Sequence, residues 1–283
     1  MKTTLKNLHS TVEINHKGAE LCSFKNKFNE EYIWEGNPEF WGKHSPVLFP
    51  IVGTLKNNSF VYNDTTYQLL RHGFARDVNF QLISKTDEEA VFSLLANEET
   101  LKVYPFLFEL HLKYTLIENE LQLAYSIYNK DNVVLPFSIG AHPAFALPKD
   151  FESYTLAFDQ SENLISYQLE NDLISDSTIE HQMSENKLPL TYSLFENDAL
   201  IFKNLNSKKI TILENNIPLL QIKFDDFPHF GIWTKKEAPF ICLEPWLGYS
   251  DTIHSNGKIM DKEAIQFIEP NEIFDLVFSI EIL

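Results

Sequence analysis

The feature that most constrains the fold of this chain is a long series of short β-branched and aromatic runs, separated by turn residues over almost its whole length. Residues 60–62 and 66–70 flank Asn63-Asp64, a dipeptide suited to a hairpin turn. Residues 106–116 and 121–128 flank a second turn at Glu118-Asn119, and both runs alternate polar and apolar positions. Further runs of this character lie at 80–84, 90–95, 199–202, 209–213, 219–224, 230–234, 240–243, 264–268 and 273–283.

Helical patterns are almost absent. Residues 97–104 are the one short amphipathic piece, and residues 38–43 are suited to a single turn. The sequence therefore predicts an all-β protein, a large antiparallel β-sandwich of two sheets. No linker or change in composition divides it, so we expect a single domain over 1–283, with the polar segment 161–187 as a surface excursion.

Charge and cysteine content exclude several classes of protein. The formal net charge is −17 and no run is rich in lysine or arginine, so neither a nucleic acid nor an anionic membrane is expected as a partner. There is no apolar run of about 18 residues and no signal-peptide pattern. Cys22 and Cys242 are too few for a disulfide framework or a cysteine-rich zinc site, and apolar surroundings predict reduced, buried thiols. These observations favour a cytoplasmic protein.

The distribution of arginine points to a ligand site. The chain has only two arginines, Arg71 and Arg76, and both lie in the hexapeptide Arg-His-Gly-Phe-Ala-Arg at 71–76. Guanidinium groups offer a rigid fork of donors to carboxylates, phosphates or vicinal hydroxyls, although surface ion pairs explain such a loop about as well. Two later segments, Gly-Ala-His-Pro-Ala-Phe at 140–145 and Cys-Leu-Glu-Pro-Trp at 242–246, favour recognition of a small, oxygen-rich ligand.

Four segments in this order give the chain a family resemblance. They are Phe-Pro-Ile-Val-Gly at 49–53, the segments at 71–76 and 140–145, and residues 240–246. Each is weak alone, but together on an all-β chain they make it resemble the aldose 1-epimerase (galactose mutarotase) family, in particular its LacX-like branch. The resemblance runs from about Val12 to the C-terminus. It implies a β-supersandwich with a sugar site in a groove across one sheet, acting on a free hexose or related sugar.

The resemblance implies three catalytic residues. His142, in its His-Pro-x-Phe context, corresponds to the general acid, and Glu244, in the late apolar strand, to the general base. His72 corresponds to the histidine that assists near the ring oxygen of the sugar. Mutarotation exchanges protons between the C1 hydroxyl and the ring oxygen through an open-chain aldehyde, so a carboxylate and an imidazolium suffice. We expect no organic cofactor and no metal.

One family position departs from the pattern. Members often carry an arginine after the Val-Gly of the first loop, where this chain has Thr54; Arg71 and Lys56 are the candidates to replace it. If the chain is extended near His72, residues four apart share a face while adjacent residues do not. Arg76 is then expected to face the groove with His72, and Arg71 to turn away toward a carboxylate.

The surroundings of the candidate residues allow further expectations. Glu244 lies in an apolar strand, where burial raises a carboxyl pKa and an unpaired carboxylate is costly, which favours a functional role. Histidines without partners are more often structural than catalytic. Trp246 and Phe74 suit either the core or a stacking floor for a sugar, whereas core packing is expected for Trp233. His229 follows Asp-Asp-Phe-Pro at 225–228 and lies close in the sequence to the candidate site, so it is expected to line that site.

Two other functions remain open from the sequence. A hexose-6-phosphate mutarotase of the same fold would use Arg76, and Arg71 with it, to clamp phosphate, although a chain of charge −17 supplies little other positive potential. A non-catalytic carbohydrate-binding sandwich, including an accessory domain of the β-galactosidase type, is the third reading. The retention of both His142 and Glu244 argues against it. The partner expected is a small sugar, bound by a monomer or homodimer.

Overall fold

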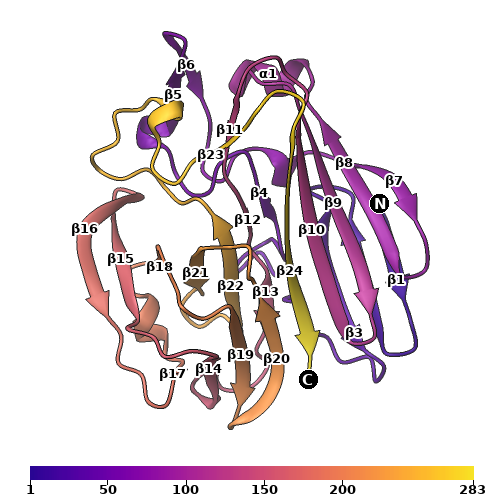
Figure 1. The fold of residues 1–283 in the computed structure, drawn as a ribbon. Helices are drawn as coiled ribbons and strands as arrows, with labels where there is room; N and C mark the ends of the chain where they lie inside the picture. The colour runs from indigo at the N-terminus through magenta and orange to yellow at the C-terminus, as the bar shows by residue number, and fades with distance from the viewer.

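The computed structural model describes residues 1–283 and consists almost entirely of antiparallel β-sheets (Figure 1). Two large sheets, of nine and eight strands, form the body of the molecule and share one hydrophobic core of 65 buried residues. The predicted all-β, two-sheet sandwich is confirmed. No helix in the chain is long and apolar enough to cross a membrane.

The nine-stranded sheet is built on long strands that alternate between core and solvent. Its strands, in spatial order, are β17 (Lys187–Pro189), β14 (Tyr154–Phe158), β19 (Lys209–Glu214), β20 (Ile217–Lys223), β24 (Ile273–Ile282), β10 (Glu120–Asn129), β9 (Phe108–Ile117), β8 (Glu89–Leu95) and β7 (Gln81–Lys85). Every second residue of β9 and β10 is buried. One face of this sheet therefore covers the core, as the alternating sequence predicts.

The eight-stranded sheet is covered on both faces at its centre. Its strands, in order, are β16 (Leu173–Glu180), β15 (Ile165–Glu170), β18 (Leu200–Phe202), β21 (His229–Trp233), β22 (Phe240–Leu247), β12 (Ile139–Ala141) and β4 (Val47–Leu48), with β13 (Ala144–Ala146) also paired to β22. All of β22 is buried. Ile241 and Leu243 pack into the main core, so Cys242 and Glu244 project from the opposite face of the sheet.

Smaller elements complete the fold. One is a three-stranded sheet of β1 (Lys2–Lys6), β2 (Ser10–Asn15) and β3 (Glu20–Asn26). Two are strand pairs, β5 (Ser59–Tyr62) with β6 (Thr65–Gln68) and β11 (Leu135–Phe137) with β23 (Gln266–Ile268). There are also five 3₁₀ turns: η1 (Lys56–Asn58), η2 (Ala75–Asp77), η3 (Phe151–Ser153), η4 (Tyr192–Phe195) and η5 (Ile259–Asp261). The one α-helix, α1 (Glu98–Val103), is capped by Asn97, whose side chain accepts from the backbone of Glu99 and Thr100. It lies where the sequence predicts it.

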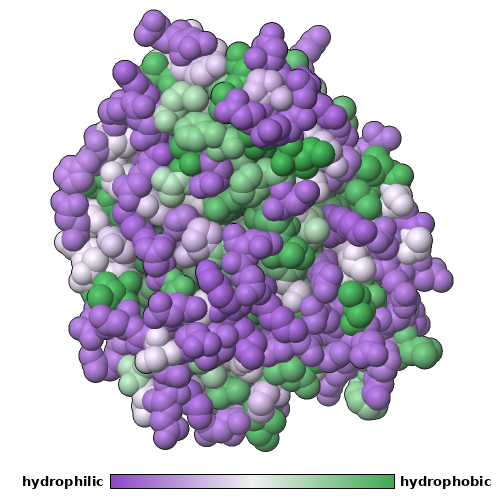
Figure 2. Space-filling model, in the orientation of Figure 1, coloured by the Kyte–Doolittle hydropathy of each residue, from purple (hydrophilic) through white to green (hydrophobic).

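The polar segment 161–187 is more structured than its composition suggests. It was expected to be a surface excursion, but most of it forms the hairpin of β15 and β16, which extends the eight-stranded sheet at its edge. The hydrophilic composition reflects the position of these strands at the edge, where much of β16 faces solvent. The face of the molecule seen in Figure 2 is mostly hydrophilic, with hydrophobic side chains exposed across its middle.

Candidate active site

The register of the central strands sets His142 opposite Glu244. Gly140 in β12 pairs with Trp246 in β22, and Ala144 in β13 pairs with Cys242. Pro143 cannot donate a backbone hydrogen bond, so β12 and β13 are separate strands, yet the register is the same on both sides of the break. His142 and Glu244 are therefore direct cross-strand neighbours on the outer face of the sheet.

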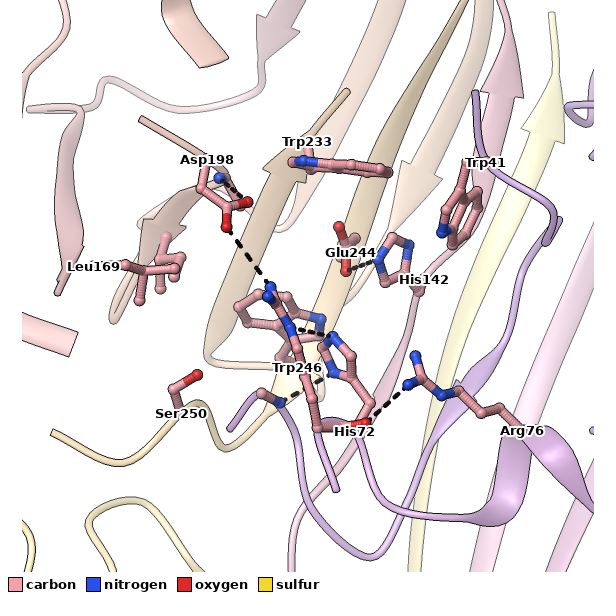
Figure 3. A pocket seen from close by; sticks show the side chains of 14 residues that line it. Trp41, His72, Arg76, His142, Leu169, Asp198, Trp233, Glu244, Trp246 and Ser250 are labelled. Carbon is pink, nitrogen blue, oxygen red and sulfur yellow. Dashed lines mark hydrogen bonds and ion pairs between the residues drawn. The ribbon is translucent and has the colours of Figure 1, made fainter. Parts of the chain in front are cut away.

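These two side chains meet in a nearly dry environment. His142 Nε2 lies 3.2 Å from Glu244 Oε2, and the two side chains are 10% and 2% exposed (Figure 3). The contact is poorly aligned, and Oε2 has no hydrogen-bond partner. Burial lowers the pKa of His142 to about 3 and raises the pKa of Glu244 well above its ordinary value of 4.5. Between these two pKa values the pair holds one proton.

An aromatic wall encloses the imidazole. The indole of Trp41 stacks on His142 with ring centroids 4.7 Å apart, and Trp233 meets the same imidazole edge-on at 5.9 Å. Trp34 holds this wall in place, because its Nε1 donates to the backbone carbonyl of Trp41 at 2.9 Å. The rings exclude water from His142, which is the main cause of its lowered pKa.

Trp246 forms the floor of the site because two neighbouring strands carry glycine. A Cβ at Gly140 in β12 would lie 2.6 Å from Cδ1 of the indole, and a Cβ at Gly231 in β21 would lie 2.5 Å from Cζ2. Any side chain at either position would push the ring away from the sheet. The glycines therefore let the indole spread over three strands beside Glu244.

His72 is held in the site by a tight loop. Its φ is +67°, and Gly73, also at +67°, passes so close to the chain that a Cβ would lie 2.2 Å from the carbonyl oxygen of Phe49. The backbone N–H of Gly53 donates to His72 Nδ1 at 3.0 Å. The neutral ring therefore carries its hydrogen on Nε2. Burial, followed by the charge of Arg71, lowers the pKa of His72 well below 6.5, so this neutral form is the stable one.

Arg71 lies over the same pocket. Its Nε approaches His72 Nε2 at 3.3 Å, and because that ring nitrogen carries a hydrogen, two N–H donors lie side by side. Its other nitrogens face Asp172 at 3.3 Å and Asp198 at 3.9 Å. A ligand oxygen placed between Arg71 and His72 would accept from both donors, while the two carboxylates hold the guanidinium in position.

Most of these side chains surround one cavity of about 310 Å³; Trp34 and Asp172 lie behind its lining. It opens on the outer face of the eight-stranded sheet and contains both arginines and three of the four tryptophans of the chain. Its size falls at the lower end of the range for small-molecule sites. The lining residues are Trp41, Gly53, Arg71, His72, Arg76, His142, Leu169, Asp198, Ala199, Ile201, Trp233, Glu244, Trp246 and Ser250.

Comparison with known proteins gives the chain its family. A model of the aldose 1-epimerase family matches residues 1–265, which include every residue that lines this cavity. This chain belongs to the aldose 1-epimerase family. It is also 33% identical to the chromosomal protein LacX of Lactococcus lactis subsp. lactis over an alignment of 298 residues that covers 100% of both chains.

Two solved structures have the same fold over the whole of this chain. A galactose mutarotase related enzyme from Lactobacillus acidophilus is 34% identical, with a TM-score of 0.94 over 100% of this chain and 97% of that one. A galactose mutarotase-like protein from Lactobacillus casei ATCC 334 is 30% identical, with a TM-score of 0.95 and complete coverage of both chains. The aldose 1-epimerase fold therefore extends over the whole sequence.

At Thr54 the family resemblance led us to expect an arginine, and of the two candidate replacements Arg71 lines the cavity. The other candidate, Lys56, is used elsewhere, because its Nζ donates to the carbonyls of Ile253 and Ser255 at 2.9 and 3.1 Å. Thr54 itself is buried, and its backbone N–H donates to Ser250. The guanidinium of Arg71 therefore reaches the cavity from the loop at 71–76.

The expected facing of the two arginines is wrong for Arg71. Both arginines line the cavity, although Arg71 was expected to turn away. The reason is the left-handed backbone of His72 and Gly73, which removes the alternation of an extended chain. Arg76 lies in η2. Its Nη2 donates to the backbone carbonyl of Arg71 at 2.8 Å, which helps to fix the loop that carries Arg71 and His72. Its Nε is buried without a hydrogen-bond partner.

Two residues that were expected at the site lie outside it. Phe74 packs against Phe49 and Phe108 on the core side, because the sharp turn before it sends the chain inward. His229 accepts from the backbone N–H of Gly248 at 3.1 Å, and its ring lies against Tyr249 at 4.8 Å. Neither side chain lines the cavity, which corrects both expectations.

Several lining residues carry no sequence signal of their own. Trp41 and Asp198 come from irregular segments, and only the fold brings them to His142 and Arg71. Trp233 was expected in the core, but its position in β21, two residues from Gly231, sets it on the outer face of the sheet.

Proposed function

We propose that this chain is a mutarotase, which interconverts the α and β anomers of a free hexose or a related sugar, with residues 1–283 acting as a single domain. The observation that carries the proposal is the cross-strand pair of His142 and Glu244, buried at the wall of a cavity lined by aromatic rings. Membership of the aldose 1-epimerase family supports it.

The proposed reaction moves two protons and breaks one bond. Glu244, as the carboxylate, accepts the proton of the C1 hydroxyl; the bond between C1 and the ring oxygen breaks; and His142, as the imidazolium, protonates the ring oxygen. The open-chain aldehyde then rotates about its C1–C2 bond. Reclosure on the other face reverses both proton transfers and restores the pair.

The pair is suited to these roles because it holds a single proton. Burial favours that proton on Glu244, and the distance of 3.2 Å allows it to pass to His142, which leaves a carboxylate beside an imidazolium. Desolvation makes the carboxylate a stronger base than a carboxylate in water, and it makes the imidazolium a stronger acid. Both changes lower the cost of ring opening.

The remaining lining residues are suited to binding the sugar. His72, neutral with its hydrogen on Nε2, and Arg71 supply donors for sugar oxygens, and Asp198 supplies an acceptor for hydroxyl hydrogens. Trp246 and Trp233 offer flat apolar surfaces to the C–H face of a pyranose ring.

A hexose-6-phosphate is the second candidate substrate, because both guanidinium groups line the cavity and Arg76 Nε has no hydrogen-bond partner, although it lies 3.6 Å from Asp77 Oδ2. The carboxylates of Asp172 and Asp198 oppose this reading, since they offset the charge of Arg71 and repel phosphate. The free sugar therefore fits the electrostatics of the site better.

Polarimetry on freshly dissolved sugars tests the proposal. The protein is added to α-D-glucose, α-D-galactose and their 6-phosphates, and the approach of optical rotation to equilibrium is compared with the spontaneous rate. We expect acceleration for at least one free hexose. Acceleration of the 6-phosphates alone would support the phosphate reading, and binding without acceleration would support the non-catalytic one.

A further inference from the structure

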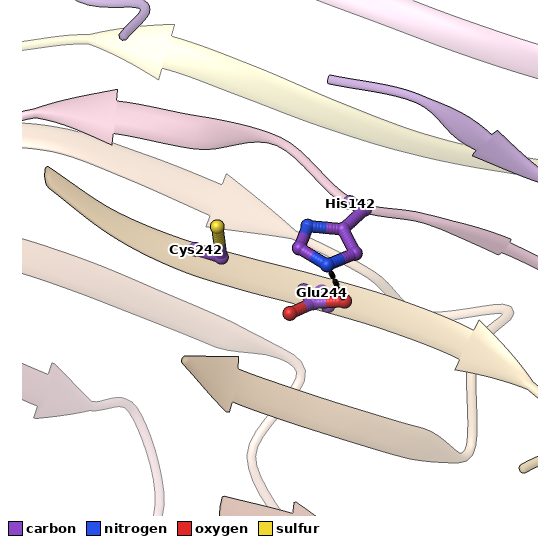
Figure 4. Close-up of side chains that lie close together, drawn as sticks. All are labelled: His142, Cys242 and Glu244. Carbon is purple, nitrogen blue, oxygen red and sulfur yellow. Dashed lines mark ion pairs between the residues drawn. The ribbon is translucent and has the colours of Figure 1, made fainter. Parts of the chain in front are cut away.

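Three side chains that bind zinc in many proteins converge at the wall of the cavity. Cys242 and Glu244 are two residues apart in β22 and project from the same face, and His142 lies directly opposite Glu244 (Figure 4). One ligand atom from each residue lies within 4.8 Å of the others, and all three residues are buried. Two of the buried polar atoms, Glu244 Oε2 and His142 Nδ1, have no hydrogen-bond partner.

We propose that His142, Cys242 and Glu244 form a site for a zinc ion, and that zinc bound there inhibits the enzyme. The inhibition rests on the proposed function, because the metal occupies the two groups that exchange protons with the sugar. The binding itself does not rest on it, since a thiolate, an imidazole and a carboxylate are sufficient zinc ligands on their own.

The geometry is close to what zinc requires. With bonds of about 2.3 Å to sulfur and about 2.0–2.2 Å to nitrogen and oxygen, tetrahedral ligands lie roughly 3.3–3.8 Å apart. The three ligand atoms are within 4.8 Å of one another, so the widest separation must close by up to about 1.5 Å when the metal binds. His142 and Glu244 are already at 3.2 Å.

The ligand set also selects the class of metal. A thiolate and an imidazole suit zinc, whereas magnesium and calcium prefer sites made only of oxygen ligands. Zinc enters from the cavity, which His142 and Glu244 line, and the fourth ligand is a water or a sugar hydroxyl on that side. Binding releases two protons to solvent, the thiol proton of Cys242 and the proton that His142 and Glu244 share, so that a thiolate, a carboxylate and a neutral imidazole bind the metal.

Cobalt tests the site without reference to activity. Co²⁺ replaces zinc in such sites, and a bound thiolate gives a sulfur-to-cobalt charge-transfer band. We expect the band on addition of Co²⁺ to the purified protein and its loss when Zn²⁺ is added. Its absence with the folded wild-type protein would overturn the proposal, whatever the mutarotase assay shows.

Two matched variants locate the sulfur ligand. Cys242→Ser keeps the shape of the side chain but removes the soft sulfur ligand. Cys22→Ser removes the other buried thiol, which lies in β3 and does not line the cavity. We expect Cys242→Ser to lose the band and to bind Zn²⁺ more than about 100-fold more weakly, since even changes to the partners of zinc ligands cost up to that factor. Cys22→Ser should behave as wild type, and the reverse pattern would contradict the site.

The activity assay tests the inhibition separately. If the wild type accelerates mutarotation, Zn²⁺ but not Mg²⁺ should abolish the acceleration, a chelator should restore it, and Cys242→Ser should keep its activity in zinc. Zinc that binds and leaves the rate unchanged would overturn the inhibition. Should Cys242→Ser fail to fold, the wild type is labelled slowly with a maleimide and analysed by mass spectrometry. Zinc should protect Cys242 and not Cys22, and equal labelling would contradict the site.

Discussion

Trp41 lies flat against His142, with the two ring centroids 4.7 Å apart. The residue that shields the candidate acid therefore comes from an irregular loop near the N-terminal end, whereas the acid itself lies between two strands of the central sheet. The proton affinity of the imidazole depends on this contact, because the indole is one of the groups that keep water from it.

The pH dependence of kcat/KM follows from the shifted pKa values of the pair. The active form holds one proton, so the rate falls at low pH when a second proton binds and at high pH when the shared proton is lost. Because burial lowers the pKa of His142 to about 3, we expect activity to persist well below pH 6.5, with the alkaline limb set by the raised pKa of Glu244. Polarimetry across pH, with circular dichroism to exclude unfolding, measures it.

A variant of the wall tests the cause of that shift. Trp41→Leu exposes His142, so its pKa should rise toward 6.5 and the acid limb should move to higher pH. An acid limb that stays in place would assign the low pKa to other groups.

Glu244→Gln should separate catalysis from stability. Losing the base should slow mutarotation roughly 10²–10⁴-fold. The unfolded chain releases the Glu244 proton as pH rises above 4.5 while the folded chain retains it, so wild-type stability declines over that range. At pH 7 the variant should therefore unfold in urea with a free energy higher by about 1 kcal/mol or more, since a tenfold change in proton affinity corresponds to about 1.4 kcal/mol. At pH 4 the two proteins should have the same free energy of unfolding. A mutarotation rate of Glu244→Gln within threefold of wild type would contradict the assignment of Glu244 as the base.

His142→Asn should lower kcat more than it raises KM, because an acid that protonates the ring oxygen acts mainly in the transition state. The residue lies 3.2 Å from Glu244 and lines the cavity. Initial rates over a range of sugar concentrations separate the two constants. A change in KM alone would make His142 a binding residue and leave the proton donor to another group.

Replacing each arginine with lysine should weaken sugar binding to a different extent. Arg71→Lys keeps the charge but loses the fork that spans His72 and Asp198, so sugar binding should weaken by about 1–3 kcal/mol. Arg76→Lys removes the bond to the carbonyl of Arg71, and we expect a smaller loss of affinity. Calorimetric titration with sugar compares them. Normal binding by both variants would make the guanidinium groups structural.

The glycines under Trp246 allow a test of the floor. Gly231→Ala would bring a Cβ within 2.5 Å of the indole, so the ring must shift, and we expect weaker sugar binding together with altered tryptophan fluorescence. Gly42→Ala is the matched control, because the nearest atom to its Cβ would lie 3.7 Å away. Equal effects of the two substitutions would remove the floor from the binding model.

The fold was predictable because strand alternation is a local property. The period-two pattern of β9 and β10 is visible in the sequence and matches their burial. The pairing of His142 with Glu244 is different, since it depends on a register across Pro143 that no local pattern specifies; the family resemblance supplied both residues.

The errors share a physical cause, which is backbone geometry that composition does not reveal. His72 adopts a positive φ although it is not glycine, and this reversed the facing of Arg71 and sent Phe74 to the core. Trp41 and Asp198 were missed because irregular segments reach the site only through long-range packing.

The gathering of both guanidinium groups at one cavity has a chemical consequence. A dicarbonyl reagent that modifies arginine in most proteins reacts at many surface positions, but this chain offers it only Arg71 and Arg76. Of these, Arg71 is the more accessible, with 41% of its side chain exposed against 21% for Arg76. An ordinary arginine reagent thus becomes a site-directed label for this protein, and a bound ligand would report its own occupancy by slowing the modification.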